Sequence, residues 1–193
     1  RLAPTPGEAV LADYVTVGAG SAGCVLAARL SADPRVTVTL LEAGGSDACN
    51  QVRIPAAFSE LFRSPRDWAY EAEGATPDRP QYWPRGKMLG GTSSMNAQMY
   101  VRGHRSDYDR WAEMGNAGWS FGDVLPYFRR AEDQERGEDE LHGVGGPLAV
   151  SDPRSPHPLT LLFVAAGAAL GLEPNPDVNG PTQEGIGLVQ LMQ

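Results

Sequence analysis

A glycine-rich turn between two apolar runs constrains this chain more than any other feature. The stretch 15–30 reads VTVGAGSAGCVLAARL, and its three glycines have the spacing G-x-G-x-x-G. A β-branched run at 13–17 precedes the glycines, and a helical pattern at 21–33 follows them. A second apolar run at 36–45 predicts another strand. The first 45 residues therefore predict a right-handed βαβ unit.

Each glycine of such a turn has a separate purpose. Gly18 is expected to make the tight turn out of the strand, and Gly20 to let the backbone approach a pyrophosphate. Gly23 is expected to let the helix pack closely on the strand. The phosphates would then meet free N–H groups at the helix N-terminus, where Ser21 adds a hydroxyl donor.

An acidic residue at the end of the second strand supports a dinucleotide. Glu42 stands 19 residues after Gly23, where a carboxylate accepts hydrogen bonds from the ribose hydroxyls of an adenosine. The same charge repels a 2′-phosphate, which argues against NADP. This pattern does not separate FAD from NAD, and a nucleotide-free α/β protein with a glycine-rich turn is the alternative.

A second glycine-rich stretch, 84–103, reads PRGKMLGGTSSMNAQMYVRG. Consecutive glycines followed by hydroxyls and an asparagine suit a backbone laid flat against a ligand. A purely structural loop is the alternative.

Three helices are predicted in the second half of the chain. The first covers 106–115 with Ser106 as its N-cap, and the second covers 120–132 with a capping box of Ser120 and Asp123. The third covers 158–171. The acidic run 132–140 is expected to be solvated, and the final stretch 186–193 is expected to be a strand with no turn after it, as in a piece of a longer chain.

The charge and the cysteines exclude several classes of function. Net charge is −8, from 16 basic and 24 acidic residues, so nucleic acid and anionic membranes are poor partners. The short basic clusters 102–105 and 129–130 are expected to be solvated faces or local ion pairs. The apolar run 159–172 is shorter than the roughly 20 residues of a transmembrane helix. Cys24 and Cys49 have no metal-ligand spacing and form no disulfide framework, which favours a cytoplasmic location.

The second glycine-rich stretch resembles the first signature of the glucose–methanol–choline (GMC) flavoprotein oxidoreductases. The similarity covers nearly the whole chain and includes LLEAGG, YWPRGKMLGG, GWSFGDVLPYFRRAE, HGVGGPLAVSDPR and LEPNPDVNGPTQEGIGLVQ. These segments resemble the N-terminal part of choline-dehydrogenase-like members. The segment IPAAFSELFRSPRDW also resembles the fatty-acid photodecarboxylase branch.

The resemblance implies an α/β, Rossmann-like FAD-binding domain followed by the start of an α+β substrate domain. It implies an N-terminal tail at 1–12, an FAD-binding portion at 13–115, and a helical segment with the start of the substrate domain at 116–193. The rest of both domains would come from a missing C-terminal half of the same fold.

The resemblance also implies which residues hold FAD. The phosphate loop is matched by Gly18, Gly20, Ser21, Ala22 and Gly23, and the adenosine-ribose position by Glu42 with Ala43. The stretch along the middle of the cofactor is matched by Met88, Gly90, Gly91 and Thr92, and the stretch beside the flavin ring by Asn96, Ala97, Gln98 and Met99. Trp68 and Arg85 match positions near the cofactor. Met95 stands where some members carry a histidine bonded to the flavin, so FAD is expected to be non-covalent.

Family chemistry implies hydride transfer from an alcohol carbon to flavin N5, with a histidine near the C-terminus as base. None of His104, His142 and His157 matches that position, and each is expected to lie on the surface or in a loop. No catalytic residue and no metal site are therefore assigned. The substrate is expected to be a small alcohol or a fatty-acid-like molecule. The alternatives are a hydroxynitrile lyase, a fatty-acid photodecarboxylase, or a non-catalytic FAD-binding fragment.

Overall fold

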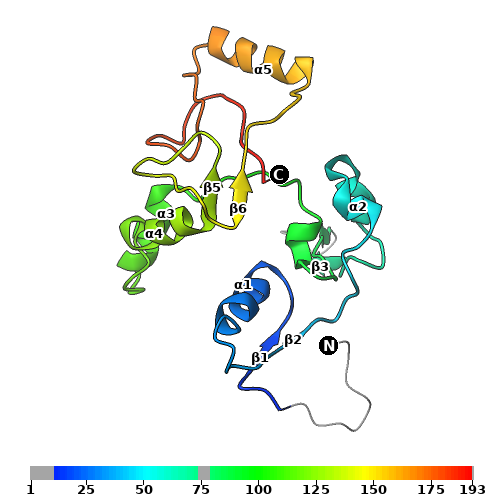
Figure 1. The fold of residues 1–193 in the computed structure, drawn as a ribbon. Coiled ribbons are helices and arrows are strands. Elements are labelled where there is room, and N and C mark those ends of the chain that lie inside the picture. Colours follow the sequence, from blue (N-terminus) through cyan, green and yellow to red (C-terminus); the bar gives the residue numbers. More distant parts are fainter. Residues whose placement is uncertain (1–10, 74–78, 193) are drawn as a thin grey trace. The chain divides into compact units, whose positions relative to one another are not determined.

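The computed structural model describes residues 11–73 and 79–192, which form two compact units that divide between Ala97 and Gln98. The first unit begins with the predicted βαβ element. Strand β1 (Tyr14–Val17) pairs in parallel with β2 (Val38–Leu41), and helix α1 (Ser21–Leu30) connects them (Figure 1). The pairing places the carboxyl ends of both strands, Val17 and Leu41, opposite each other.

The remainder of the first unit is built from short elements around a small core. Helix α2 (Asn50–Arg53) leads into the 3₁₀ helix η1 (Pro55–Leu61), and a second 3₁₀ helix, η2, covers Gly91–Ser94. The fully buried side chains Leu61, Met88 and Met95 pack together, with Cys49 and Val52 against them. Met88 and Met95 belong to the second glycine-rich stretch, so this stretch is anchored in the core of the unit.

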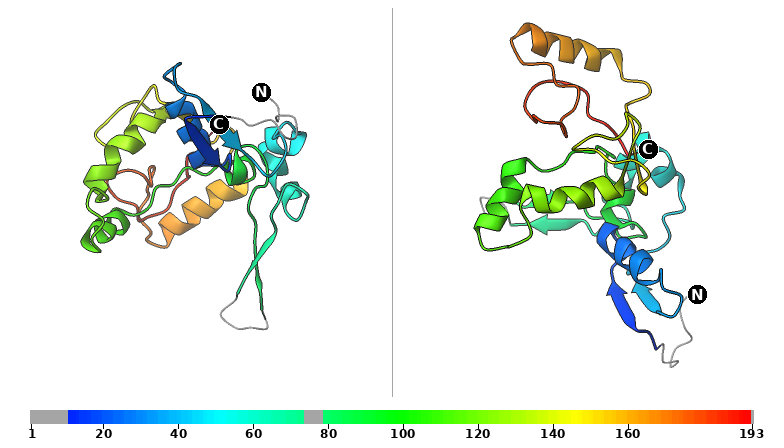
Figure 2. Two further views of the ribbon diagram at one scale, coloured as in Figure 1. Left: turned by 90° about the horizontal axis from the view of Figure 1, so that it is seen from below. Right: turned by 60° about the vertical axis from the view of Figure 1, so that its left-hand side comes forward.

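An antiparallel hairpin extends from this unit, formed by β3 (Tyr70–Ala72) and β4 (Gln81–Trp83) (Figure 2). Asp67 anchors its base. The carboxylate, 7% exposed, accepts hydrogen bonds from the Tyr82 hydroxyl and from the backbone N–H groups of Arg63, Ala69 and Arg85, the last three at 2.9 Å. Burial alone would raise the pKa of this carboxyl, but these hydrogen bonds outweigh it and hold the pKa below its ordinary value.

Replacing Asp67 with asparagine is expected to lower the free energy of unfolding at neutral pH by about 1–3 kcal/mol, because buried donors lose a charged acceptor. Since the folded pKa is lowered, the contribution is complete above the ordinary carboxyl pKa of about 3.9 and fades as pH falls through the folded value. Urea unfolding of wild type and Asp67→Asn from neutral to strongly acidic pH checks this. Asp47→Asn, an exposed carboxylate in the same unit, is the control; equal losses in both variants would contradict the anchoring role.

The second unit packs a helical hairpin beside a two-stranded parallel sheet. Its elements are α3 (Arg105–Glu113), α4 (Phe121–Ala131), β5 (Glu132–Gln134), β6 (Leu148–Val150) and α5 (Pro158–Ala169). The α3–α4 hairpin is joined by aromatic contacts, with the buried Tyr108 ring 5.4 Å from Trp111 and 5.7 Å from Phe128 between centroids. The expected capping box of Ser120 and Asp123 begins α4.

Two local predictions in this unit are wrong. Helix α3 is capped by His104, not Ser106: the His104 Nδ1 accepts the Ser106 N–H, and Asp107 accepts the His104 N–H at 3.0 Å. The imidazole thus does what a serine hydroxyl usually does. The segment 186–192 is extended but forms only isolated bridges, at Ile186 and Leu191, because its partners at 174, 99 and 151 are single positions instead of a strand.

The prediction of a solvated 132–140 run holds at 133 and at 135–140, which are exposed, but is wrong at the buried Glu132 and Gln134. His142 lies in a loop, as predicted, but it is buried there. Glu132 is completely buried as the first residue of β5, and its carboxylate pairs with the buried guanidinium of Arg102 at 2.8 Å. His142, 2% exposed, lies between Glu132 and Asp177, at 3.0 Å and 2.9 Å from their oxygens. Arg102 is therefore not part of a solvated basic face, and its partner lies 30 residues away in sequence.

Helix α5 is apolar and exposed over much of its surface. Leu159, Leu162 and Phe163 are 67%, 64% and 72% exposed. None of the helices within 11–73 and 79–192 is long and apolar enough to cross a membrane.

Candidate nucleotide-binding site

The first glycine-rich turn has the geometry that its spacing predicts. Gly18 takes φ +90°, in the left-handed region, and its N–H donates to the Leu41 carbonyl at 2.7 Å. A Cβ at Gly23 would lie 1.9 Å from the Gly18 carbonyl oxygen, so any larger residue would push α1 away from the turn. The turn and the close helix packing therefore both require glycine.

Gly20 differs from its neighbours because space is open beside it. It is the N-cap of α1 with φ −76°, and a Cβ there would meet no atom within 4 Å. The N–H groups of the first helical turn, at 21–23, cannot bond within the helix, and the described part of the chain provides them no acceptor. Open space beside free N–H groups and a positive helix end suits a pyrophosphate.

The second glycine-rich stretch lies directly against this turn. The Gly90 N–H donates to the Ala19 carbonyl at 2.7 Å, and Gly90 forms a parallel bridge with Gly20. A Cβ at Gly91 would lie 2.8 Å from the Gly20 Cα. The two motifs, separated by about 70 residues in sequence, thus form one backbone surface.

Glu42 follows β2 directly and is half-buried beside the turn. Its Oε2 accepts the Ala19 N–H at 2.7 Å, and its Oε1 accepts the Gly44 N–H at 2.8 Å. Its neighbour Ala43 is exposed. The carboxylate is therefore positioned where the sequence predicts it, at the carboxyl edge of the two strands.

The remaining residues of the second stretch divide between core and surface. Met88 is completely buried, so only its backbone can face a ligand, and Met95 is buried in the same core. Thr92 accepts the Gly86 N–H through Oγ1 at 3.1 Å. Asn96 is half-buried and Ala97 exposed at the end of the unit.

Gln98 and Met99 belong to the second unit. Gln98 has φ +59°, in the left-handed region, which a side-chain-bearing residue rarely adopts. Met99 is 59% exposed and bridges to Leu191.

Trp68 and Arg85 lie at the base of the hairpin. The Trp68 ring stacks on Tyr70 at 5.7 Å, and the Lys87 ammonium lies 4.5 Å from its centre. The Arg85 guanidinium lies 5.3 Å from the Trp83 ring centre. Trp68 is 40% exposed and so retains a free aromatic surface.

Each of the three histidines makes contacts that stabilise the fold. His104 caps α3, and His157 caps α5 by accepting the Leu159 N–H at 3.1 Å. His142 belongs to the buried network with Glu132. Each histidine thus contributes to holding the fold together, and none is assigned a catalytic role.

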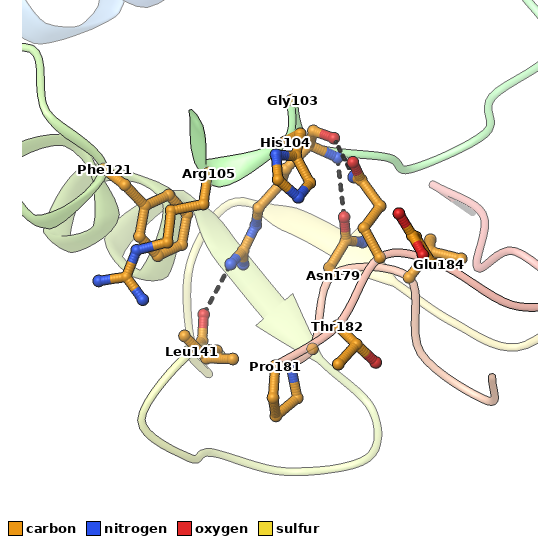
Figure 3. A pocket seen from close by; sticks show the side chains of 13 residues that line it. Gly103, His104, Arg105, Phe121, Leu141, Asn179, Pro181, Thr182 and Glu184 are labelled. Atoms are coloured by element: carbon orange, nitrogen blue, oxygen red, sulfur yellow. Dashed lines mark hydrogen bonds between the residues drawn. The ribbon is translucent and has the colours of Figure 1, made fainter. Parts of the chain in front are cut away.

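A pocket in the second unit has no counterpart in the sequence analysis (Figure 3). It has a volume of about 280 Å³ and lies between the segments 102–105 and 178–184, with Phe121 and Leu141 at one side. Asn179 accepts the Arg102 N–H at 2.7 Å and so joins the two segments. No sequence motif indicates this pocket, because its walls come from loops that are far apart in sequence. Its lining includes both a basic residue, Arg105, and an acidic one, Glu184.

Several known proteins are similar to this chain over most of its length. A family model described as GMC oxidoreductase matches residues 12–193. The chain is 50% identical over 182 residues to an uncharacterized GMC-type oxidoreductase of Mycobacterium bovis, covering 90% of this chain and 34% of that protein. It is 46% identical over 182 residues to the oxygen-dependent choline dehydrogenase of Sinorhizobium fredii, covering 93% and 33%.

Among solved structures, the pyridoxine 4-oxidase from Mesorbium loti superposes with a TM-score of 0.88 at 39% identity. The match covers 95% of this chain and 37% of that one. The chain thus spans about a third of the length of the curated relatives it matches.

Proposed function

The chain belongs to the GMC oxidoreductase family, and from this membership we propose that it is the N-terminal, FAD-binding part of an enzyme that oxidises an alcohol. FAD is the cofactor of this family. Choline and pyridoxine, named in two of the relatives, both carry a primary alcohol. A small alcohol is therefore the proposed substrate class, and the remainder of the fold is the proposed source of the base and the substrate pocket.

One observation carries the proposal: open space at Gly20 meets free helix N–H groups and an acidic residue within one backbone surface. Gly20, Ser21, Ala22 and Gly23 would hold the pyrophosphate, with Gly18 shaping the turn. Glu42 and Ala43 would face the ribose. The remaining proposed contacts are Met88 through its backbone, Gly90, Gly91, Thr92, Asn96, Ala97, Gln98, Met99, Trp68 and Arg85.

When bound, FAD supplies a two-electron acceptor for hydride. This chain's own contribution is to bind and orient the cofactor, since no catalytic residue is assigned to it. Met95 has no nucleophilic nitrogen and is buried in the core, which supports non-covalent binding. The cytoplasmic location stays a prediction from cysteine usage.

The purified full-length protein is expected to be yellow, with flavin absorbance that remains in the supernatant after acid precipitation, and to bleach when an alcohol substrate is added without oxygen. Absorbance spectra and intact mass check the cofactor and its attachment together. A colourless protein that takes up no added FAD would overturn the proposal, and flavin in the acid pellet would overturn its non-covalent part.

A further inference from the structure

The Glu42 carboxylate connects two separate loops of the first unit. One oxygen holds the N–H of Ala19 in the glycine turn at 2.7 Å, and the other holds the N–H of Gly44 after β2 at 2.8 Å. Both distances are those of charge-assisted hydrogen bonds. A residue whose only purpose is to accept ribose hydroxyls has no need of these two contacts.

The two loops that Glu42 holds are the ones on which the second glycine-rich stretch docks. Ala19, completely buried, accepts the Gly90 N–H at 2.7 Å. Gly45 accepts the Leu89 N–H at 3.0 Å. A Cβ at Gly44 would lie 2.0 Å from the Lys87 carbonyl oxygen, so this docking is tight. Glu42 therefore lies between the two backbone surfaces that receive residues 88–91.

We propose that Glu42 is a positioning residue, which fixes the glycine turn and the 42–45 loop in one arrangement before a dinucleotide binds. The inference deepens the proposed function, because the preformed surface is the one proposed to receive FAD. A carboxylate has about four acceptor positions, so two remain for ribose hydroxyls. Positioning and ribose binding are then two uses of the same side chain.

Two substitutions of Glu42 separate the need for two acceptor oxygens from the need for a side chain of this length. Glu42→Gln keeps the length of the side chain but replaces one acceptor oxygen with an NH₂ group. Both backbone groups facing it are donors, so one of them loses its acceptor and faces another donor. Glu42→Asp keeps both oxygens but is one methylene shorter, so it is expected to reach only one of the two N–H groups.

Site-resolved amide hydrogen exchange on the full-length protein, stripped of flavin, tests the proposal. In Glu42→Gln at least one of the amides of Ala19 and Gly44 is expected to exchange about tenfold faster, as for loss of a charged hydrogen-bond partner. The Gly18 amide, bonded to the Leu41 carbonyl, is the internal reference and is expected to change little. Asp47→Asn, whose exposed side chain makes no hydrogen bond or ion pair within the described residues, removes the same charge from the same loop and is the matched control.

The kinetics of FAD binding provide a second readout. A site that must reorganise binds more slowly, so Glu42→Gln is expected to slow FAD association about tenfold. A lost ribose contact alone would speed dissociation and leave association unchanged.

Unchanged exchange at Ala19 and Gly44 in Glu42→Gln overturns the positioning role, whatever happens to FAD affinity. Faster exchange at either amide supports it even if the protein binds no FAD, in which case only the proposed function fails. If Glu42→Gln does not fold, Glu42→Asp is measured in its place. Faster exchange at one of the two amides then supports the proposal, and no change at either overturns it.

Discussion

Replacing Glu132 with alanine is expected to lower the free energy of unfolding of the full-length protein by about 3–5 kcal/mol. The variant leaves the Arg102 guanidinium buried without its partner at 2.8 Å. It also removes an acceptor from His142 and from the Gly143 N–H, which donates to Glu132 at 3.0 Å. An unpaired buried charge costs far more than the pair itself contributes.

Urea unfolding of the two proteins measures this effect. Glu138→Ala is the matched control, because Glu138 also pairs with an arginine, Arg129 at 2.9 Å, but is 61% exposed. That variant is expected to lose less than about 1 kcal/mol. Equal losses in the two variants would mean that the Arg102–Glu132 pair is not buried in the full-length protein.

Replacing Gly20 with valine is expected to abolish FAD retention while the protein stays folded, weakening the affinity by at least about 100-fold, or roughly 2.7 kcal/mol. The backbone at Gly20 suits any residue, and a Cβ there meets no atom within 4 Å. It would instead fill the space proposed for the pyrophosphate. The folding cost is limited to the N-cap preference for glycine over valine, about 1 kcal/mol.

Equilibrium titration of the flavin-free protein with FAD, followed by flavin fluorescence, checks this result, with thermal unfolding to show that the fold is retained. Gly122→Ala is the control, because a Cβ at this position in α4 meets only the Ser120 hydroxyl, at 4.0 Å. A Gly20→Val protein that binds FAD as wild type does would place the pyrophosphate elsewhere.

The elements that the sequence predicted well are those specified by neighbouring residues. The β1–α1–β2 unit follows from alternating apolar runs and the glycine spacing, and Glu42 follows from its place at the end of a strand. The capping box at Ser120 is equally local. These patterns need no knowledge of what the chain packs against.

The features that sequence reasoning missed depend on contacts between distant positions. Glu132 lies at the start of an acidic run, and only Arg102 and His142, brought to it by the fold, make its burial possible. The N-cap at His104 was missed for a different reason, because imidazole is an uncommon cap whose role only the loop geometry reveals.

The candidate site shows the same division. Both glycine-rich stretches were identified, but not their mutual contact, because Gly90 and Gly91 meet Ala19 and Gly20 through backbone atoms that carry no side-chain pattern. Met88 and Met95 show what a motif leaves out, namely whether a side chain is buried. A motif indicated proximity to a cofactor, whereas burial shows that these side chains serve the core.

The backbone contact between Gly20 and Gly91 has a consequence for exchanging segments between homologous enzymes. No change of a neighbouring side chain can relieve a clash between main chains, so each of the two stretches limits the shape that the other can take. A chimera that takes 18–23 from one parent and 86–91 from another joins two halves of one surface. A crossover that keeps both stretches from the same parent preserves their fit.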